Sequence, residues 1–284
     1  MVAWGASRLI AGEHRWEYAA CVVVGPALAF AHWRSRRLMV SMLPFVLVGL
    51  LYDAMRYVKN VGLSAGRVHV CDLRALDALL FGSGGETVHD WLQRHPSAWL
   101  DRLCALPYGT FVAVTVAFAL GLALRGDRGA MARFGWTFFV MNVLGFATYH
   151  VYPAAPPWYF HQRGCAVDLG AVASAGPNLL RVDAWLGFSY FRGLYGRSND
   201  VFGSVPSLHV AYPALIVAEG WRSFSVWARA ASCGFAALMA FAAVYLDHHW
   251  LIDVVLGIVY CAASYALVAW AVTRFGHTGA RSAA

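Results

Sequence analysis

Residues 245–275 read YLDHHWLIDVVLGIVYCAASYALVAWAVTRF, a polar and aromatic stretch that opens the last long apolar run of the chain. The run from 250 to 275 is longer than the roughly 20 residues that a helix needs to cross a bilayer. In such a helix His249 and Asp253, four residues apart, share one face. We expect the carboxylate to accept a hydrogen bond from one imidazole nitrogen, so that the other nitrogen is free to act as nucleophile or general base. The alternative is an interfacial cluster that only anchors a helix end.

The composition predicts an integral membrane protein. Of the 284 residues, 60% are hydrophobic and 13% are charged, and the mean hydropathy is +0.55. A soluble core does not need so much apolar surface. The net charge of +7 is almost entirely arginine, because Lys59 is the only lysine. The arginines are scattered between apolar runs, a pattern that orients membrane helices and argues against a nucleic-acid partner. Residues 1–10 do not resemble a cleavable signal peptide.

Hydropathy predicts an all-α bundle of six to seven transmembrane helices within a single membrane domain, residues 1–284. Two amphipathic segments, 72–81 and 86–94, are too short to span and are expected to form short interfacial helices on the outer face. The candidate spans are residues 18–33, 38–57, 103–124, 134–152, 206–221, 226–245 and 250–275.

Arginine clusters predict the orientation. The clusters at 34–37, 125–133 and 222–229, with the C-terminal tail, fall on one side, which the positive-inside rule makes cytoplasmic. The histidine stretch and the segments 58–98 and 153–205 then face outward. We therefore expect a bacterial inner-membrane protein whose active site faces the periplasm or the outer leaflet. Seven spans would put the amino terminus outside; alternatively residues 1–15 lie along a membrane surface, or the first span does not cross.

A second motif, Phe-Gly-Ser-Val-Pro-Ser-Leu-His, occupies residues 202–209. Its glycine and proline favour a turn, and Ser204 and Ser207 can supply hydroxyl and backbone donors where the fifth span begins. Backbone amides at a helix amino terminus bind phosphate well. His209 falls in the first turn of that span, where it serves either catalysis or only a helix cap.

A third motif, Tyr-Pro-Ala-Ala-Pro-Pro-Trp-Tyr at residues 152–159, ends the fourth span and predicts a rigid, extended exit. Trp158 and Tyr159 would form the wall of a pocket for a lipid headgroup. An aromatic belt at the membrane interface explains both side chains equally well.

The second motif followed by HHWLID at 248–253 resembles the type-2 phosphatidic acid phosphatase superfamily. The combination of PPWY, FGSVPSLH and YLDHHWLID is more similar to its inositol phosphorylceramide synthase branch, the aureobasidin-sensitive enzymes and their bacterial relatives. The resemblance covers residues 100–275, which we take as the catalytic core, with a looser similarity at 52–56.

The resemblance implies metal-independent phosphoryl transfer through a phosphohistidine, without a cofactor. Carried over by motif, His249 is the nucleophile, Asp253 orients it, and His209 is the general acid and later the general base. One candidate function is a transferase that moves a phospho-headgroup such as inositol phosphate from a phospholipid donor to a lipid acceptor such as ceramide. The second is a lipid or polyprenyl phosphate phosphatase. A non-enzymatic channel or binding protein would leave the histidines and the aspartate without a role.

The chain departs from the superfamily pattern at its phosphate clamp. The expected Ser-Arg pair is replaced by Ala242-Ala243, and the motif KxxxxxxRP is absent. Positive charge for the phosphate must therefore come from elsewhere. The basic candidates are Arg56, Lys59, Arg163, Arg192 and Arg197, and His248 is a further candidate for substrate binding.

Two other expectations concern metals and cysteines. His248, His249 and Asp253 do not make a tetrahedral site without another ligand, so we expect no catalytic metal. Cys71 and Cys165 lie in predicted outer segments and are expected to form a disulfide that ties the interfacial helices over the active-site loop.

The last expectation is a pocket open sideways to the outer leaflet. The two interfacial helices would form part of its entrance, and Arg56 or Arg197 would point into it. His209 and His249 would both reach one phosphate.

Overall fold

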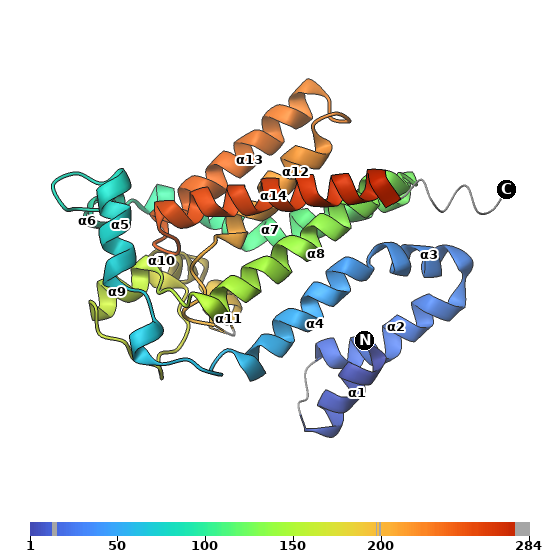
Figure 1. Ribbon diagram of the computed structural model, residues 1–284, viewed down its shortest axis with the longest axis horizontal. Helices are drawn as coiled ribbons and strands as arrows, with labels where there is room; N and C mark the ends of the chain where they lie inside the picture. Colours follow the sequence, from blue (N-terminus) through green and yellow to red (C-terminus); the bar gives the residue numbers. More distant parts are fainter. Residues whose placement is uncertain (13–15, 197, 199, 276–284) are drawn as a thin grey trace.

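The computed structural model describes residues 1–12, 16–196, 198 and 200–275, which form the helical bundle of Figure 1. The described residues form helices and isolated bridges only, which confirms the all-α prediction. The α-helices are α1 (Val2–Ile10), α2 (Trp16–Ala31), α3 (Trp33–Ser41), α4 (Leu43–Val58), α5 (Cys71–Phe81), α6 (Val88–Arg94), α7 (Ala98–Arg125), α8 (Arg128–Val151), α9 (Pro157–Arg163), α10 (Gly176–Leu186), α11 (Tyr190–Tyr195), α12 (Leu208–Gly220), α13 (Val226–Tyr245) and α14 (Leu251–Phe275).

Among the described residues, four helices are long and apolar enough to cross a membrane: α7, α8, α13 and α14. The bent pair α3–α4 can add a fifth. The chain is therefore an integral membrane protein, but the predicted number of six to seven spans is not confirmed. The first predicted span corresponds to α2, with 16 residues, and the fifth to α12, with 13 residues. Both are shorter than the roughly 20 residues that a complete crossing needs.

The second predicted span is broken between Ser41 and Leu43, where the axes of α3 and α4 differ by 54°. Pro44 lies in the first turn of α4 and has no backbone N–H to continue the hydrogen-bond ladder of α3. Further along α4, Asp53 accepts hydrogen bonds of 3.0 Å from Trp4 Nε1 and from the Tyr18 hydroxyl. These bonds tie α1 and α2 to α4.

Helix α12 is short and is surrounded by protein. It packs against α7, α8, α13 and α14, and most of its residues are buried. Glycines let the neighbouring helices approach its start. A Cβ atom at Gly145 of α8 would lie 3.0 Å from Leu208, and one at Gly257 of α14 would lie 2.3 Å from the Ser207 carbonyl oxygen. Irregular backbone is tolerated at membrane depth where protein covers it, as it does before α12.

The two ends of the bundle differ in character. Helix α3, the turn between α7 and α8, and the end of α14 lie at one end, and α5, α6 and α9 lie at the other (Figure 1). The first end carries Arg34 and Arg36 of α3 and Arg125 at the end of α7, as the arginine pattern predicted. The opposite end carries His209 and His249 and is called the histidine end below.

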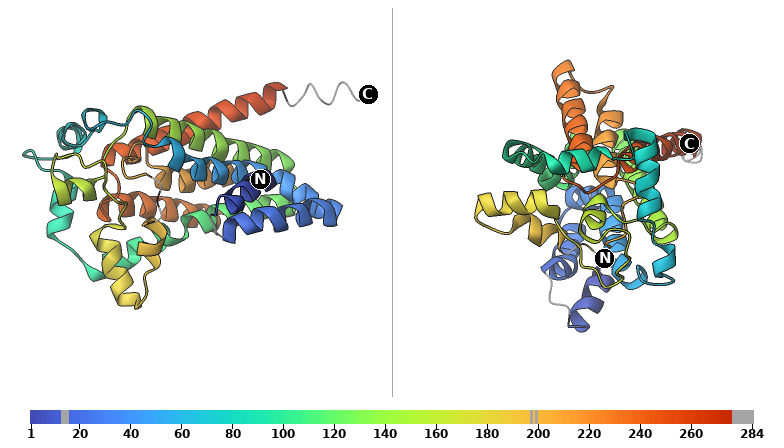
Figure 2. Two further views of the ribbon diagram at one scale, coloured as in Figure 1. Left: turned by 90° about the horizontal axis from the view of Figure 1, so that it is seen from below. Right: turned by 90° about the vertical axis from the view of Figure 1, so that its left-hand side faces the viewer.

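Short helices and a disulfide cover the histidine end. Cys71, the first residue of α5, is bonded to Cys165, which follows α9, and their Cα atoms are 5.5 Å apart. The predicted disulfide is thereby confirmed. Helix α5 contacts α14, and α6 contacts α13. Figure 2 shows that α10 and α11 project sideways from the bundle at this end.

Three extended segments meet beneath these helices. Ala154 forms parallel bridges with His69 on one side and with Gly203 on the other. The Ala154 N–H donates to the Phe202 carbonyl at 2.7 Å, and the Ser204 N–H donates to the Ala154 carbonyl at 3.2 Å. The proline-rich segment after α8 therefore fixes the backbone of the motif that leads into α12.

Candidate active site

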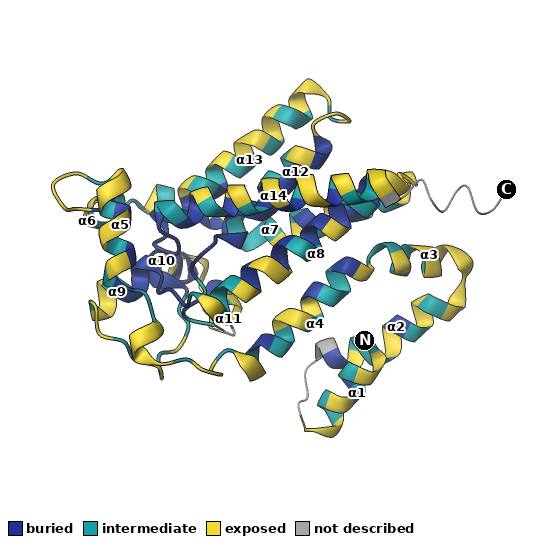
Figure 3. Ribbon diagram, viewed as in Figure 1, coloured by how far each residue is buried: buried dark blue, intermediate teal, exposed yellow. Residues whose placement is uncertain are grey.

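The site centres on two imidazole rings that the fold brings into contact. His209 is the second residue of α12, and His249 lies two residues before α14. His209 Nδ1 and His249 Nε2 are 3.0 Å apart. His249 is buried and His209 is partly buried, and Figure 3 shows buried backbone, in dark blue, beside α10 at this end of the bundle. Two motifs 40 residues apart therefore meet as the sequence predicted.

The second nitrogen of His249 contacts a backbone carbonyl. Its Nδ1 lies 2.9 Å from the carbonyl oxygen of Ser204. A carbonyl oxygen only accepts, so Nδ1 carries the proton and Nε2 keeps its lone pair. In this arrangement His209 Nδ1–H donates to His249 Nε2. The nitrogen that keeps a lone pair is therefore Nε2, and it faces His209.

The carboxylate of Asp253 lies slightly farther from the His249 ring than the hydrogen bond expected from their four-residue spacing. Its nearest carboxylate oxygen lies 3.6 Å from His249 Nδ1, beyond the range of a normal hydrogen bond. The same oxygen accepts a hydrogen bond from the Ser204 hydroxyl and one of 2.9 Å from the Trp250 N–H. Asp253 thus holds Ser204, the residue that contacts His249 directly. The carboxylate still lies close enough to stabilise positive charge on the ring.

Aromatic side chains enclose His209. Its ring stacks on Tyr108 with centroids 4.6 Å apart, and Phe111 lies at 4.7 Å. His209 Nε2 is 3.3 Å from the Tyr195 hydroxyl, which is 3.2 Å from the Tyr108 carbonyl. When both ring nitrogens are protonated, this chain is fully paired, because Nε2–H donates to Tyr195 and Tyr195 donates to the carbonyl. The pairing suits a general acid, but no sequence pattern pointed to Tyr108 or Tyr195.

His248 faces the same cavity in a fixed, neutral form. Its Nε2 lies 2.9 Å from the Ala175 carbonyl and therefore carries the proton. The pKa of His248 is lowered to about 4, mainly by burial; the Ala175 carbonyl opposes this shift and the neighbouring His249 adds to it. The ring is uncharged at neutral pH, and Nδ1 remains a hydrogen-bond acceptor.

A cavity of about 1400 Å³ leads from the histidines along the bundle. His209, His248, His249, Ser204 and Trp158 line its polar part. Its apolar part runs between α4 and α7 and reaches α1 and α2; the lining there includes Val46, Val48, Leu50, Phe111, Val112, Val116, Met1 and Trp4.

Two other predicted binding residues lie outside the lining of this cavity. The Tyr159 ring is buried, and its hydroxyl donates to the Ala166 carbonyl at 3.1 Å. The Ser207 hydroxyl is also buried and has no hydrogen-bond partner among the described residues. Direct contact of either side chain with substrate stays a prediction.

The basic residues predicted to bind phosphate differ in their position relative to the cavity. Arg56 pairs with Asp53 at 2.7 Å and contacts Tyr18, beside the cavity. Arg163 pairs with Asp168 at 2.7 Å, and its side chain is 43% exposed. Arg197 lies outside the described residues. None of the described residues that line the cavity is an arginine or a lysine.

A second polar network binds the histidine stretch through Asp247. Asp247, which adopts a left-handed backbone conformation with φ 67°, binds His161 Nδ1 at 2.7 Å. His161 Nε2 binds Asp90 at 3.1 Å, and Asp90 pairs with Arg74. Burial alone would lower the pKa of His161, but its two carboxylate partners raise it. Asp247 stands in the quoted stretch, yet its partners are too distant in sequence for a pattern to reveal them.

The site does not resemble a metal centre. Among the described residues, no group of three or more His, Cys, Asp or Glu side chains is arranged to hold a metal ion. The donors at the site are two imidazoles in mutual contact and a carboxylate that is already bonded to Ser204 and Trp250. Metal-free chemistry stays a prediction.

Taken together, a membrane-embedded helical bundle in which two histidines and a buried aspartate meet defines a class of lipid phosphatases and phosphotransferases. Comparison with known families agrees: the profile of the PAP2 superfamily matches residues 71–267. The chain belongs to the PAP2 superfamily, and it is an enzyme of the phosphatase and phosphotransferase type.

Individual relatives show which members of the superfamily this chain is similar to. Phosphoinositol dihydroceramide synthase of Bacteroides thetaiotaomicron is 35% identical over 259 residues, which cover 88% of this chain and 81% of the relative. The catalytic subunit of inositol phosphorylceramide synthase of Schizosaccharomyces pombe is 29% identical over 65% of this chain and 43% of its own length. That of Saccharomyces cerevisiae is 26% identical, with 65% and 45% covered. No solved structure matches the chain significantly.

Proposed function

We propose that the protein transfers inositol phosphate from a phospholipid to the hydroxyl of a ceramide-type lipid, through a phosphohistidine at His249. The relative from Bacteroides thetaiotaomicron, a phosphoinositol dihydroceramide synthase, supports this substrate pair, since the similarity covers 88% of this chain. The contact between His209 and His249 supports the two-step chemistry.

In the first step His249 Nε2 attacks phosphorus, and the bond between phosphorus and the diacylglycerol oxygen breaks. His209, protonated on both ring nitrogens, donates its Nδ1 proton to the departing oxygen, so diacylglycerol leaves as a neutral alcohol and His209 becomes neutral. The donor phosphate must first separate the two rings, because the hydrogen bond between them occupies the attacking lone pair. Asp253 and the Ser204 carbonyl stabilise the positive charge that develops on the His249 ring.

In the second step the acceptor hydroxyl enters where diacylglycerol left. His209 takes the hydroxyl proton, the oxygen attacks phosphorus, and the bond between phosphorus and nitrogen breaks. His248 can accept a hydrogen bond from a substrate hydroxyl at Nδ1, because its Nε2–H is committed to Ala175. This hydrogen bond supports a role for His248 in substrate binding rather than in proton transfer.

The single observation that favours transfer over phosphatase chemistry is the charge of the cavity. Its described lining includes Asp53 and Asp200 but neither arginine nor lysine. A phosphodiester donor carries one negative charge, whereas a phosphomonoester carries about −1.5 to −2 at neutral pH. Burying the more highly charged group without a cation is much less favourable. The lining therefore fits a diester better than the monoester that a phosphatase would bind.

Backbone amides can supply the missing positive potential. Helix α12 starts directly at the site, and its N-cap residue Ser207 makes no side-chain capping bond. The first backbone N–H groups of a helix lack partners within the helix and favour anions. We place the donor phosphate near this helix start, beside Ser204. Arg56 and Arg197 remain candidates for a further contact.

The lipid chains would occupy the apolar part of the cavity between α4 and α7. Its lining there is aliphatic and aromatic, and it continues from the histidines without a break. The interfacial helices α5 and α6 are not among the lining residues and contact α14 and α13 instead. The entrance we propose is therefore formed by α4, α7 and α11, in place of the α5 and α6 entrance expected from the sequence.

One assay separates the two candidate reactions. Purified protein receives phosphatidylinositol labelled in its headgroup, with and without ceramide. We expect a labelled inositol phosphorylceramide that depends on ceramide, and little free inositol phosphate. Release of free headgroup at the same rate with or without ceramide would instead assign hydrolysis. His249→Ala should abolish both the product and the labelled protein intermediate.

We also propose that the protein lies in a bacterial inner membrane with the histidine end toward the periplasm. The arginines at the opposite end support this orientation, and a disulfide at the histidine end fits an oxidising compartment. A membrane-impermeant maleimide tests it on cells. It should label a cysteine introduced at Ser83, an exposed position between α5 and α6, but not one at Gly129, an exposed position near the start of α8.

A further inference from the structure

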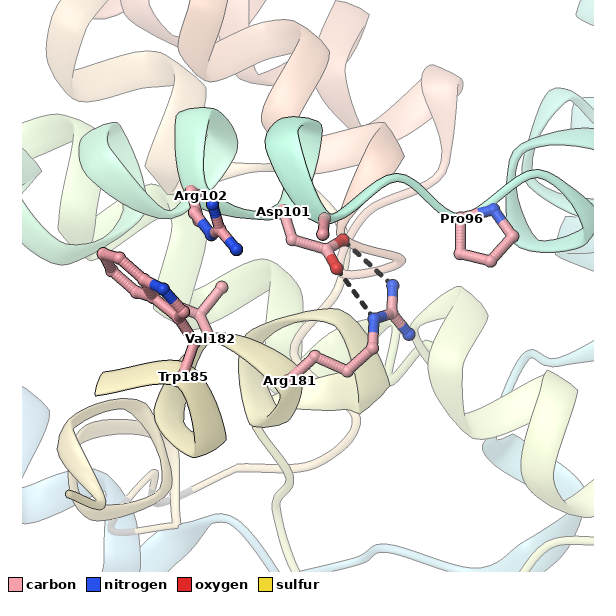
Figure 4. A pocket seen from close by; sticks show the side chains of 7 residues that line it. Pro96, Asp101, Arg102, Arg181, Val182 and Trp185 are labelled. Atoms are coloured by element: carbon pink, nitrogen blue, oxygen red, sulfur yellow. Dashed lines mark hydrogen bonds and ion pairs between the residues drawn. The ribbon is translucent and has the colours of Figure 1, made fainter. Parts of the chain in front are cut away.

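A second pocket lies at the histidine end, separate from the cavity described above. It has a volume of about 260 Å³ and lies between the first turns of α7 and helix α10. Figure 4 shows its side chains; the lining residues are Pro96, Ala98, Asp101, Arg102, Arg181, Val182 and Trp185. None of these residues lines the cavity of the histidines.

The pocket has one positive charge in excess. Arg181 donates to both oxygens of Asp101, at 2.7 and 2.9 Å, and the Tyr245 hydroxyl also donates to this carboxylate at 2.8 Å. Arg102 has no carboxylate partner within the described part of the chain, and its guanidinium stacks over the Trp185 ring at 4.6 Å. A stacked guanidinium keeps its N–H groups available in its own plane, which suits a phosphate oxygen. Two arginines against one aspartate therefore leave a charge of +1 for a ligand.

The surroundings place this pocket at the level of lipid headgroups. The Tyr190 hydroxyl at the start of α11 donates to the Gly109 carbonyl of α7 at 2.8 Å. Gly109 lies seven residues beyond Arg102, which corresponds to about 10 Å along a helix. The segment that joins α10 to α11 thus reaches deeper along the spanning helix than the pocket does. Trp185, near the end of α10, and Phe188, in the segment that joins α10 to α11, are 60% and 59% exposed, as expected for side chains in contact with lipid.

We propose that this pocket binds the phosphate of an anionic phospholipid in the leaflet at the histidine end. The lipid carries one negative charge on a phosphodiester, which matches the excess charge of Arg102. Its chains lie along the exposed apolar residues of α10 and α11. The lipid is a ligand and not the reacting donor, because both catalytic histidines lie outside the pocket.

The pocket is also connected to the catalytic stretch. Asp101 binds the hydroxyl of Tyr245, the last residue of α13, and the Tyr245 carbonyl accepts from Asn178 of α10 at 3.1 Å. Tyr245 directly precedes the segment that carries His248 and His249. A lipid held between α7 and α10 therefore stabilises the corner from which the catalytic stretch departs.

Native mass spectrometry of the full-length protein in a neutral detergent tests the proposal. The probe is short-chain phosphatidylglycerol, compared with phosphatidylcholine of the same chain length. Arg102→Gln should weaken binding of one phosphatidylglycerol about ten- to hundredfold, the range for loss of a hydrogen bond to a charged group. Arg102→Lys keeps the charge but not the stacked, planar guanidinium, and should bind more tightly than Arg102→Gln and more weakly than wild type. The control Arg94→Gln removes an exposed arginine at the same end, paired with Glu86, and should bind like wild type.

Three results would overturn the proposal: unchanged binding by Arg102→Gln, an equal loss with Arg94→Gln, or equal binding of phosphatidylcholine. Inorganic phosphate added as competitor distinguishes the sources of the phosphate group. Displacement of the lipid by phosphate at comparable concentration would assign the pocket to free anions and refute the lipid. Headgroup transfer by Arg102→Gln in phosphatidylcholine bilayers reports separately on the catalytic site.

Discussion

The charge of Asp253 offers the sharpest test of the catalytic geometry. Its carboxylate lies 3.6 Å from His249 Nδ1. When Nε2 bonds to phosphorus, the ring becomes positively charged, and with an effective dielectric constant of about 20 the carboxylate stabilises that charge by about 4 to 5 kcal/mol. Asp253→Asn removes the charge but keeps the shape and an acceptor for the Trp250 N–H. Because only part of the charge has developed in the transition state, we expect phosphorylation of His249 to slow by about 10²- to 10³-fold.

Asp77→Asn is the matched control. Like Asp253, Asp77 is fully buried and accepts a backbone N–H bond at the start of α14, from Ile252 at 3.0 Å. Its carboxylate forms no hydrogen bond or ion pair with His249 in the described structure, so its loss should disturb the helix start to a similar extent without removing the charge beside His249. We expect this variant to keep its rate within about fivefold, since it loses no charge stabilisation in the transition state.

Rapid-quench measurement of labelled protein, with phosphatidylinositol labelled in its headgroup, gives the phosphorylation rate directly. Thermal unfolding of both variants shows whether the fold is kept. If Asp253→Asn phosphorylates within tenfold of wild type, the carboxylate does not stabilise the charged ring. If Asp77→Asn is slowed as much as Asp253→Asn, the effect comes from the start of α14 and the electrostatic reasoning is wrong.

Three further outcomes follow from the same geometry. His209→Ala should lower turnover about 10²- to 10⁴-fold with the natural donor, and much less with a donor whose leaving group needs no proton, because only the acid is lost; steady-state rates with both donors check this. The pKa of His161 is raised in the folded state above its usual value of 6.5. The contribution of protonated His161 to the free energy of unfolding is therefore complete below about pH 6.5, and it is lost as the pH rises through the raised pKa. Melting temperatures of wild type should therefore fall with rising pH in that window, and His161→Gln should show a flatter profile; parallel profiles would contradict the assignment. Gly257→Ala should destabilise by about 1 to 3 kcal/mol, because its Cβ would meet the Ser207 carbonyl at 2.3 Å, whereas Gly121→Ala in α7 meets nothing within 4 Å and should melt like wild type or higher.

The sequence predicted the elements that depend on local pattern. The sixth span, 226–245, has the observed bounds of α13, and the meeting of His209 with His249 followed from two motifs at helix starts. The number of spans was not predictable from hydropathy, because an apolar run does not reveal whether lipid or protein covers it. Helix α12 is the example: it is as apolar as a spanning helix but is surrounded by four others.

The finer parts of the site depend on backbone positions that only the assembled fold sets. The His249 partner is the Ser204 carbonyl, and that carbonyl is placed by the bridge from Gly203 to Ala154. Tyr195 reaches His209 from a short helix that no hydropathy pattern marks. An i,i+4 spacing places Asp253 on the correct face of the helix, but it does not predict that the carboxylate binds the Ser204 hydroxyl and the Trp250 N–H.

The length of α12 has a consequence for the choice of acceptor. Its 13 residues extend about 20 Å, whereas the hydrocarbon layer is about 30 Å thick. If the last residue of α12 lies at the arginine-rich surface of the hydrocarbon layer, His209 in its first turn lies about 10 Å below the opposite surface of that layer. Helix α7 gives a similar depth. Its 28 residues extend about 42 Å, so a centred α7 exceeds the hydrocarbon layer by about 6 Å at each end. Tyr108, which stacks on His209, lies about 15 Å from the first residue of α7 and therefore about 9 Å inside the layer. Water is scarce at that depth, whereas the hydroxyl of a lipid alcohol can reach the imidazoles along the apolar part of the cavity. The depth of the imidazoles therefore favours a lipid alcohol over water as the acceptor, even without a side chain that discriminates between these two acceptors.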